Sequence, residues 1–155
     1  MTRKTLLVAI DLGKASSSVV SRAGELAKSL SAKIVLLHVA EPTAANLPVG
    51  KEPRGTTAAA WPLRTPKSQA KLEQRLSALA EPLKHAGIEV KTNLVAGLLA
   101  DEILDQSLEC RADYIVLGSR GKATQHLVSR QDALTGMLRR LKCPLIIVPV
   151  TTASG

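Results

Sequence analysis

One stretch of the sequence, GSRGKATQHLVSRQDALTG at residues 118–136, has residue types and spacing that could bind a phosphate. Gly118 and Gly121 directly follow the apolar run YIVL, and glycines at such a turn let backbone N–H groups approach a phosphate closely. The N-terminus of the following helix would add positive potential. A phosphate cradle is one interpretation of this turn. The other is an ordinary turn, because turns after parallel strands commonly contain glycine.

The region around this turn is also strongly basic. Between residues 111 and 142, seven basic residues stand against two acidic ones, and this net of five is most of the chain's formal charge of +8. A single-stranded nucleic-acid platform would need stacking aromatic side chains. The chain has one Trp, one Tyr and no Phe, so nucleic-acid binding is disfavoured. A solvated basic face and a bound phosphate compound are the interpretations left open.

The sequence contains no pattern that predicts catalysis or metal binding. The motifs H-E-x-x-H, G-x-S-x-G and G-x-x-x-x-G-K-[ST] do not occur, so we predict no catalytic residue and no metal ligand. His38 is expected to be a hydrogen-bonded core histidine, and His126 to lie in the loop. Cys110 and Cys143 are expected to be reduced and structural, because a small secreted scaffold usually carries more cysteines.

Short apolar runs alternate with amphipathic patterns along the chain. Four of the five runs are nearly continuous, as in strands buried on both faces, while the run at 88–95 alternates as an edge strand does. Serines 16–18 offer an N-cap to the first helix, and Pro82 predicts a distortion in the second. The expected strands are 5–10, 33–39, 88–95, 113–118 and 144–150, and the expected helices are 16–31, 67–86, 100–111 and 128–142.

This alternation predicts a doubly wound α/β fold, with a five-stranded parallel sheet covered by helices on both faces. We expect one domain over residues 1–150, a long proline-containing loop or lid at 40–66, and a disordered tail at 151–155. No stretch of about 18 apolar residues occurs, and the N-terminal apolar run is too short for a signal peptide. A cytoplasmic protein without membrane contact is therefore expected.

A ligand of such a sheet binds beyond the C-terminal ends of the strands, where the strand order reverses. Asp11, Val39, Gly97 and Gly118 each follow or end one of the first four predicted strands. They are the residues expected to meet at this edge of the sheet.

The chain resembles the universal stress protein family over essentially its whole length. The resemblance is carried by LLVAIDLGKAS and KIVLLHV near the N-terminus, by VAGLLADEILDQSLECRADYIVLGSRGK in the middle, and by LKCPLIIVPV near the end. It implies a Rossmann-like sheet with strand order 3-2-1-4-5.

The resemblance also implies an adenine-nucleotide site for ATP or AMP. In nucleotide-binding members, residues that match Asp11 and Val39 contact the adenine and ribose. The phosphates of those members lie on a motif of Gly, two residues, Gly, nine residues, then Gly and Ser or Thr. Gly118 and Gly121 match the first half of this motif.

The second half of the motif is replaced, because this sequence has Gln131 and Asp132 where the family has Gly and Ser or Thr. Gln131 puts a side chain where phosphate oxygens would reach the backbone. Asp132 is expected to accept the free amide hydrogens of a helix start and to repel a polyphosphate. Two like charges about 4 Å apart cost roughly 4 kcal/mol at an effective dielectric of 20, about a thousandfold in affinity. Basic neighbours such as Arg120 would offset part of this.

Three functions follow from these observations. The first is a non-enzymatic, dimeric stress-response protein with a degenerate nucleotide site, and the second is a working ATP or AMP sensor. The third, an α/β nucleotide-dependent enzyme, is disfavoured because DLGKASS lacks the signatures of such enzymes. A homodimer through 144–150 is expected, since an apolar edge strand needs a cover and the resemblance implies pairing there, with Pro149 limiting the ladder.

Overall fold

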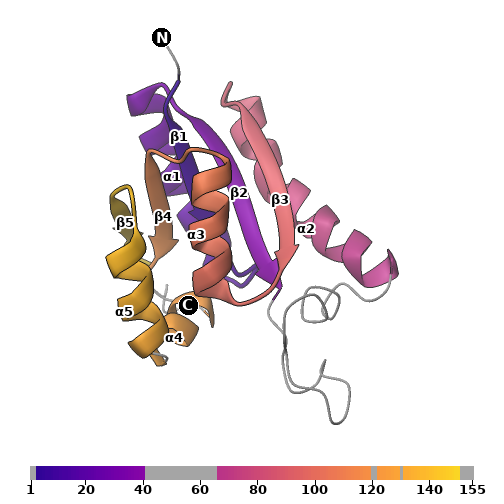
Figure 1. The fold of residues 1–155 in the computed structure, drawn as a ribbon. Helices are drawn as coiled ribbons and strands as arrows, with labels where there is room; N and C mark the ends of the chain where they lie inside the picture. The colour runs from indigo at the N-terminus through magenta and orange to yellow at the C-terminus, as the bar shows by residue number, and fades with distance from the viewer. Residues whose placement is uncertain (1–2, 41–65, 120–121, 130, 151–155) are drawn as a thin grey trace.

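The structure of the chain is a computed structural model that describes residues 3–40, 66–119, 122–129 and 131–150. Within those ranges five strands alternate with five helices (Figure 1). The strands are β1 (Thr5–Ala9), β2 (Lys33–Ala40), β3 (Val90–Ala96), β4 (Tyr114–Gly118) and β5 (Leu145–Val148). The helices are α1 (Ser16–Leu30), α2 (Pro66–His85), α3 (Leu99–Glu109), α4 (Lys122–Ser129) and α5 (Gln131–Arg140).

All strand pairs of the sheet are parallel, and the strand order is β3-β2-β1-β4-β5. The predicted doubly wound fold and strand order are therefore confirmed. The central strand β1 pairs with β2 from Thr5↔Lys33 onward, and with β4 from Leu6↔Tyr114 onward. β3 and β5 are the edge strands.

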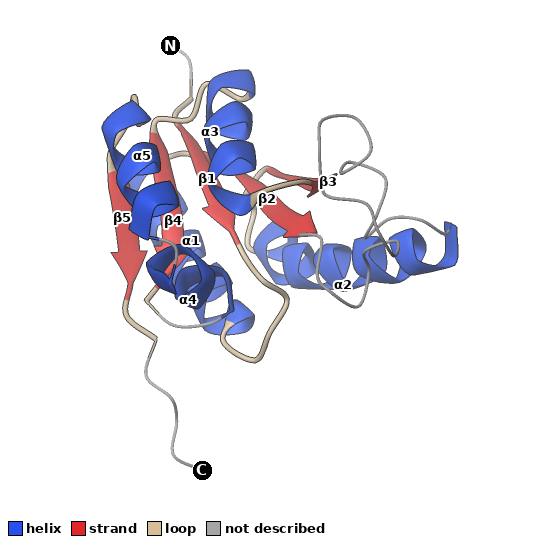
Figure 2. Cartoon of the chain, turned by 60° about the horizontal axis from the view of Figure 1, so that its bottom comes forward, coloured by secondary structure: helices blue, strands red, loops and turns tan. Residues whose placement is uncertain are grey.

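Two hydrophobic cores lie on opposite faces of this sheet, because successive side chains of a strand point to opposite sides. Leu6 and Val8 of β1 pack on the face covered by α1 and α2. Leu7 and Ala9 pack on the face covered by α3, α4 and α5 (Figure 2). Strands β1, β4 and β5 are almost wholly apolar, which explains their continuous runs in the sequence.

The ends of the helices follow backbone geometry more than capping side chains. The N-cap of α1 is Ala15, which makes no side-chain capping bond, so the prediction that serines cap this helix was wrong. Helix α2 continues through Pro82 to His85, and the chain then turns at Gly87 with a φ of 84°. A glycine suits this left-handed conformation.

The region after β4 differs most from the prediction. A loop followed by one helix at 128–142 was expected, whereas the structure has two helices, α4 and α5. Residues 122–129 contain neither Gly nor Pro, and Leu127 gives α4 a buried side chain, so this segment forms a helix of its own. His126 therefore lies in α4 and not in a loop.

The ends of the two edge strands differ slightly from the prediction. β3 begins two residues later than predicted, and β5 ends at Val148. The predictions for Arg120, Gly121, the tail at 151–155 and the loop at 40–66, except its two end residues, fall outside the described residues. In the parts of the chain that are described, no helix has the length and apolar character needed to cross a membrane.

Candidate functional site

A crevice lies where the C-terminal ends of β1 and β4 meet. The chain leaves β1 toward one face of the sheet and β4 toward the other, so this is the point at which ligands bind in folds of this kind. Asp11 and Gly118 line the crevice together, as predicted, with Ser16 and Thr124 beside them. Its volume is only about 10 Å³, about the space for one water.

The carboxylate of Asp11 is held by groups of its own loop. Its Oδ1 accepts a hydrogen bond from the Gly13 N–H at 2.7 Å and another from the Ser16 hydroxyl at 3.1 Å. Ser16 is buried, so it keeps this carboxylate at the start of α1. The bond to Gly13 is the local turn that Asp side chains commonly make.

A long-range contact fixes the same loop from the other side. Leu12 is buried in a left-handed conformation with a φ of 62°, and its carbonyl accepts a hydrogen bond from the Arg75 guanidinium of α2. A left-handed leucine is costly unless its surroundings hold it. Arg75 therefore helps to hold the loop that carries Asp11.

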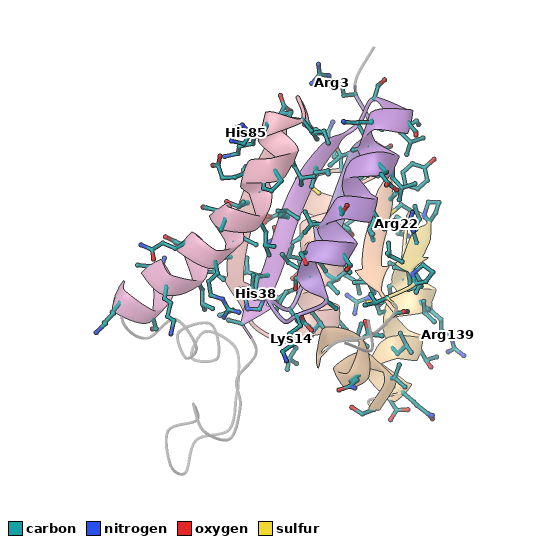
Figure 3. The ribbon with its side chains drawn as sticks, turned by 180° about the vertical axis from the view of Figure 1, so that it is seen from behind. Arg3, Lys14, Arg22, His38, His85 and Arg139 are labelled. Atoms are coloured by element: carbon teal, nitrogen blue, oxygen red, sulfur yellow. The ribbon has the colours of Figure 1, made fainter. Side chains whose placement is uncertain are left out.

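His38 lies at the same end of the sheet, as Figure 3 shows together with Lys14. Its Nδ1 lies 2.9 Å from the Ile10 carbonyl oxygen, so Nδ1 carries the hydrogen and donates it. Burial lowers the pKa of His38, and the positive charge of Arg75 lowers it further, against the opposing effects of the Ile10 carbonyl and Asp11. The predicted hydrogen bond of His38 is confirmed, although its side chain is half-buried and belongs to neither core.

The polar groups around Gly118 are also engaged. The Thr124 hydroxyl donates to the Gly118 carbonyl. The Ser119 N–H donates to Val148 at 2.8 Å, and the Ser119 hydroxyl accepts from the Val150 N–H at 2.9 Å. These bonds tie the turn after β4 to the end of β5.

Val39 and Gly97 lie at the neighbouring ends of β2 and β3, outside the lining of the crevice. Val39 is buried in the core under α3 and pairs with Val95. Gly97 has a φ of 152°, and a Cβ on it would lie 2.8 Å from Oε1 of Glu102. Burial raises the pKa of Glu102, with neighbouring carboxylates adding to the effect. Gly97 is therefore required by the close approach of α3.

Gln131 and Asp132 lie in the first turn of α5, away from the crevice. Both side chains are exposed. No described residue donates a hydrogen bond to the Asp132 carboxylate, so the predicted capping bond is not formed. The reason is that α5 already begins at Gln131, which places Asp132 within the first turn instead of before it.

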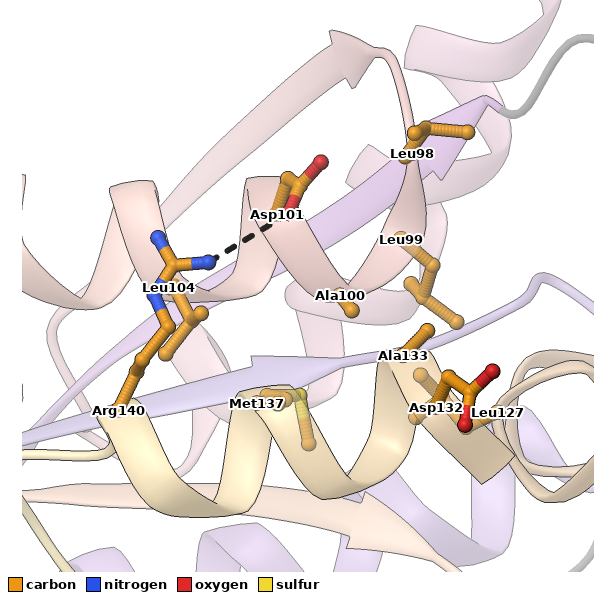
Figure 4. Close-up of a pocket in the computed structure, with 11 residues that line it drawn as sticks. Leu98, Leu99, Ala100, Asp101, Leu104, Leu127, Asp132, Ala133, Met137 and Arg140 are labelled. Atoms are coloured by element: carbon orange, nitrogen blue, oxygen red, sulfur yellow. Dashed lines mark ion pairs between the residues drawn. The ribbon is translucent and has the colours of Figure 1, made fainter. Parts of the chain in front are cut away.

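Asp132 instead lines a cavity of about 210 Å³ between α3 and α5 (Figure 4). Leu104 and Met137 contribute apolar side chains to this cavity, and Asp101 pairs with Arg140 at 3.8 Å at its rim. The sequence-predicted residues are thus divided. Asp11 and Gly118 come together, while the residues of the second half of the motif lie on another surface.

The contacts that sequence reasoning missed are those of Arg75 and Thr124. Arg75 bonds a residue 63 positions earlier, so no local pattern could reveal it. Thr124 lies in a helix that was not predicted. The one available signal for Arg75 was the predicted fold, which places α2 beside α1 and therefore near the loop that precedes α1.

The titratable groups of the described residues offer little reactive chemistry. No cluster of three or more His, Cys, Asp or Glu side chains that could hold a metal ion occurs in the described ranges. Cys110 and Cys143 are free, partly buried thiols, and burial is the main cause that raises the pKa of each. Raised thiol pKa values disfavour the reactive thiolate.

The sequence was compared with family models and with curated proteins. The Universal stress protein family model matches residues 2–149. A curated relative, Universal stress protein Sll1654 of Synechocystis sp., is 27% identical over 146 residues, which are 94% of this chain and 85% of the relative.

Two solved structures share the fold. A universal stress protein in complex with cAMP has a TM-score of 0.65 and 21% identity, over 97% of this chain and 100% of its own. A universal stress protein from Archaeoglobus fulgidus in complex with dAMP has a TM-score of 0.62 and 17% identity, over 96% of this chain and 99% of its own. Since the family model spans nearly all of the sequence, the chain belongs to the universal stress protein family.

Proposed function

We propose that this chain is a cytoplasmic, non-enzymatic stress-response protein, a homodimer whose adenine-nucleotide site is degenerate. The observation that carries the proposal is the small volume of the crevice between Asp11 and Gly118, about 10 Å³. A nucleotide is far larger, so it enters only if the crevice opens. The polar groups on each side of the crevice are already hydrogen-bonded, Asp11 to Gly13 and Ser16, and Gly118 to Thr124, so a nucleotide would have to displace these bonds.

The charge at the expected phosphate end supports the same proposal. Asp132 presents an exposed carboxylate in the first turn of α5, where a phosphate would otherwise use the positive potential. Gln131 adds a side chain beside it. Neither residue offers the close backbone approach that a glycine allows.

The absence of enzymatic activity is part of the proposal. Asp11 is bound by Gly13 and Ser16, and His38 uses Nδ1 on a backbone carbonyl. A nucleophile held against a general base is the usual sign of covalent catalysis. The hydrogen bonds described above for Asp11 and His38 do not have that form.

The alternative is a working adenine-nucleotide sensor. Two universal stress proteins of the same fold have been solved with cAMP and with dAMP. In this chain Asp11 and Gly118 meet at the switch point, which is where such a ligand would be expected. Under this alternative, the bonds of the Asp11 carboxylate to its own loop are exchanged for bonds to the ligand.

Calorimetric titration with ATP and AMP, with and without Mg²⁺, distinguishes the two functions. For the degenerate site we expect no saturable binding by the native chain below about 1 mM. The double change Gln131→Gly with Asp132→Ser removes an exposed carboxylate outside the lining of the crevice, so it should gain binding by no more than about fivefold. Thr135→Ser, an exposed change in the same helix, is the matched control.

Two outcomes would contradict the proposal. Micromolar binding of ATP or AMP by the native chain would establish the sensor instead. Release of labelled phosphate from ATP, lost in an Asp11→Asn variant, would establish an enzyme.

A further inference from the structure

A second cavity, separate from the crevice, lies between α1 and α2 on the opposite side of the molecule from α3 and α5. Its volume is about 310 Å³, and it shares no lining residue with the crevice. Leu79, Leu83 and Ile88 give it an apolar wall, while Ser21 and Lys28 of α1 give it a polar one.

The two helices that form the cavity approach closely at Gly24. A Cβ on Gly24 would lie 2.7 Å from Cδ2 of Leu83, so α1 and α2 are in direct contact there. Beside this contact, Ala78 of α2 and Ala86 just after the helix contribute small side chains to the lining. The contact fixes the spacing of the helices, and the small side chains leave the space open.

Pro82 gives the cavity a hydrogen-bond acceptor. Within a helix, a proline removes the N–H that would bond the carbonyl four residues earlier, and its ring pushes that carbonyl aside. The affected carbonyl is that of Ala78, and both Ala78 and Pro82 line the cavity. The missing helix bond therefore lies on the side of α2 that faces the cavity.

Two charged side chains, Glu25 and Lys28, line the rim of the cavity, and they differ in whether they form an ion pair. Glu25 pairs with Arg22 at 3.1 Å. Lys28 has no ion pair with any described residue, although it lines the cavity in a chain of net charge +8. The rim thus carries one available positive charge, which favours an anionic group on a ligand.

We propose that the cavity between α1 and α2 binds a small aromatic carboxylic acid that also carries a hydroxyl or ring N–H donor. The ring packs on Leu79, Leu83 and Ile88. The donor bonds the Ala78 carbonyl, and the carboxylate pairs with Lys28.

Fluorescence titration of the full chain with three probes tests this assignment. The probe 6-hydroxy-2-naphthoate has the donor and the carboxylate, 6-methoxy-2-naphthoate lacks the donor, and 2-naphthol lacks the carboxylate. For the first probe we expect saturable binding with a dissociation constant of about 1 mM or tighter, typical of a ligand with about a dozen non-hydrogen atoms. The methoxy probe should bind about three- to tenfold more weakly, the range for one hydrogen bond.

Variants separate the three contacts. Pro82→Ala restores the N–H to the helix and should bring the hydroxy and methoxy probes to equal affinity. Lys28→Met should weaken the hydroxynaphthoate about two- to fivefold and leave 2-naphthol unchanged, while Lys84→Met, outside the cavity, changes neither. Ser21→Leu should fill the cavity and abolish binding, whereas Ser18→Leu, an exposed change on the same helix, should not.

Three results would overturn the proposal. The first is the lack of saturable binding by the native chain, and the second is unchanged binding by Ser21→Leu. The third is a preference for the hydroxy probe that persists in Pro82→Ala, since the Ala78 carbonyl would then not be the acceptor. None of these results depends on the nucleotide site.

Discussion

At the scale of single residues, the polar groups at the end of β1 are hydrogen-bonded to neighbouring groups of the chain. Asp11 is bound by its own loop, Arg75 bonds the Leu12 carbonyl, and His38 bonds the Ile10 carbonyl. Each of these hydrogen bonds pairs a polar group that would otherwise be left without a partner in a partly buried place. The sequence could indicate that Asp11 lies here, but not that neighbours already occupy its carboxylate.

His38 makes the stability of the fold depend on pH. Its pKa in the folded chain is below the ordinary value of 6.5, so the unfolded chain takes up the proton first as the pH falls. The contribution is fully present above pH 6.5 and is lost as the pH drops from there toward the folded pKa. His38→Asn keeps a donor for the Ile10 carbonyl without titrating in this range.

Urea unfolding between about pH 5 and 8 measures this effect, and that range is where histidine normally titrates. We expect the free energy of unfolding to fall less steeply below pH 6.5 in His38→Asn than in the native chain. Equal slopes for native and His38→Asn proteins would refute the assignment.

Arg75 is expected to stabilise the loop that carries Asp11. Removing its guanidinium in Arg75→Met leaves the Leu12 carbonyl without this donor, and the side chain is exposed, so the loss should be modest, about 1 kcal/mol. Chemical denaturation measures it, with Lys71→Met on the same helix as the control. A loss no larger than that of the control would show that the left-handed Leu12 holds its conformation without Arg75.

At the scale of elements, the periodicity of the sequence predicted the five strands of the described residues. Four are continuous apolar runs, which have one good explanation in a sheet covered on both faces, and the alternating fifth is the edge strand β3. The periodicity did not predict α4, since eight residues with a single buried leucine give too short a pattern to distinguish a helix from a loop. The serines before α1 looked like caps, yet Ser16 is used to hold Asp11. The capping preference of serine was therefore overridden by a side-chain contact that exists only in the folded chain.

Two glycines in the helical regions around α3 and α5 should respond oppositely to alanine. Gly136 lies inside α5, and a Cβ there would meet nothing within 4 Å, so Gly136→Ala should stabilise the protein by about 0.5–1 kcal/mol. Gly97 has a φ of 152° and no room beside Glu102, so Gly97→Ala should destabilise it by about 1 kcal/mol or more. Thermal and urea unfolding of the two variants give the comparison, and a gain from both would contradict the packing described for α3.

At the scale of the whole molecule, the layers followed from alternation and right-handed connections, which leave few arrangements for five parallel strands. The strand order followed from the family resemblance. The site was harder to predict, because its parts are brought together only by the fold. Gly118 and Gln131 are close in sequence, yet α4 intervenes and they line different surfaces. Spacing along the motif therefore identified the family but not the geometry of this member's site.

The edge strand β5 leads to the prediction for the assembly. Ile147 is 47% exposed on this strand and Leu138 is 49% exposed on α5, and apolar side chains on an open edge favour pairing with a second copy. We expect a homodimer in light scattering at micromolar concentration. Ile147→Lys puts a charge on the edge of each copy, so it should raise the dissociation constant at least tenfold and give a monomer. Val128→Lys, at a similarly exposed site on α4, should remain dimeric. A loss of the dimer in both variants would show that added charge, and not the β5 edge, is the cause.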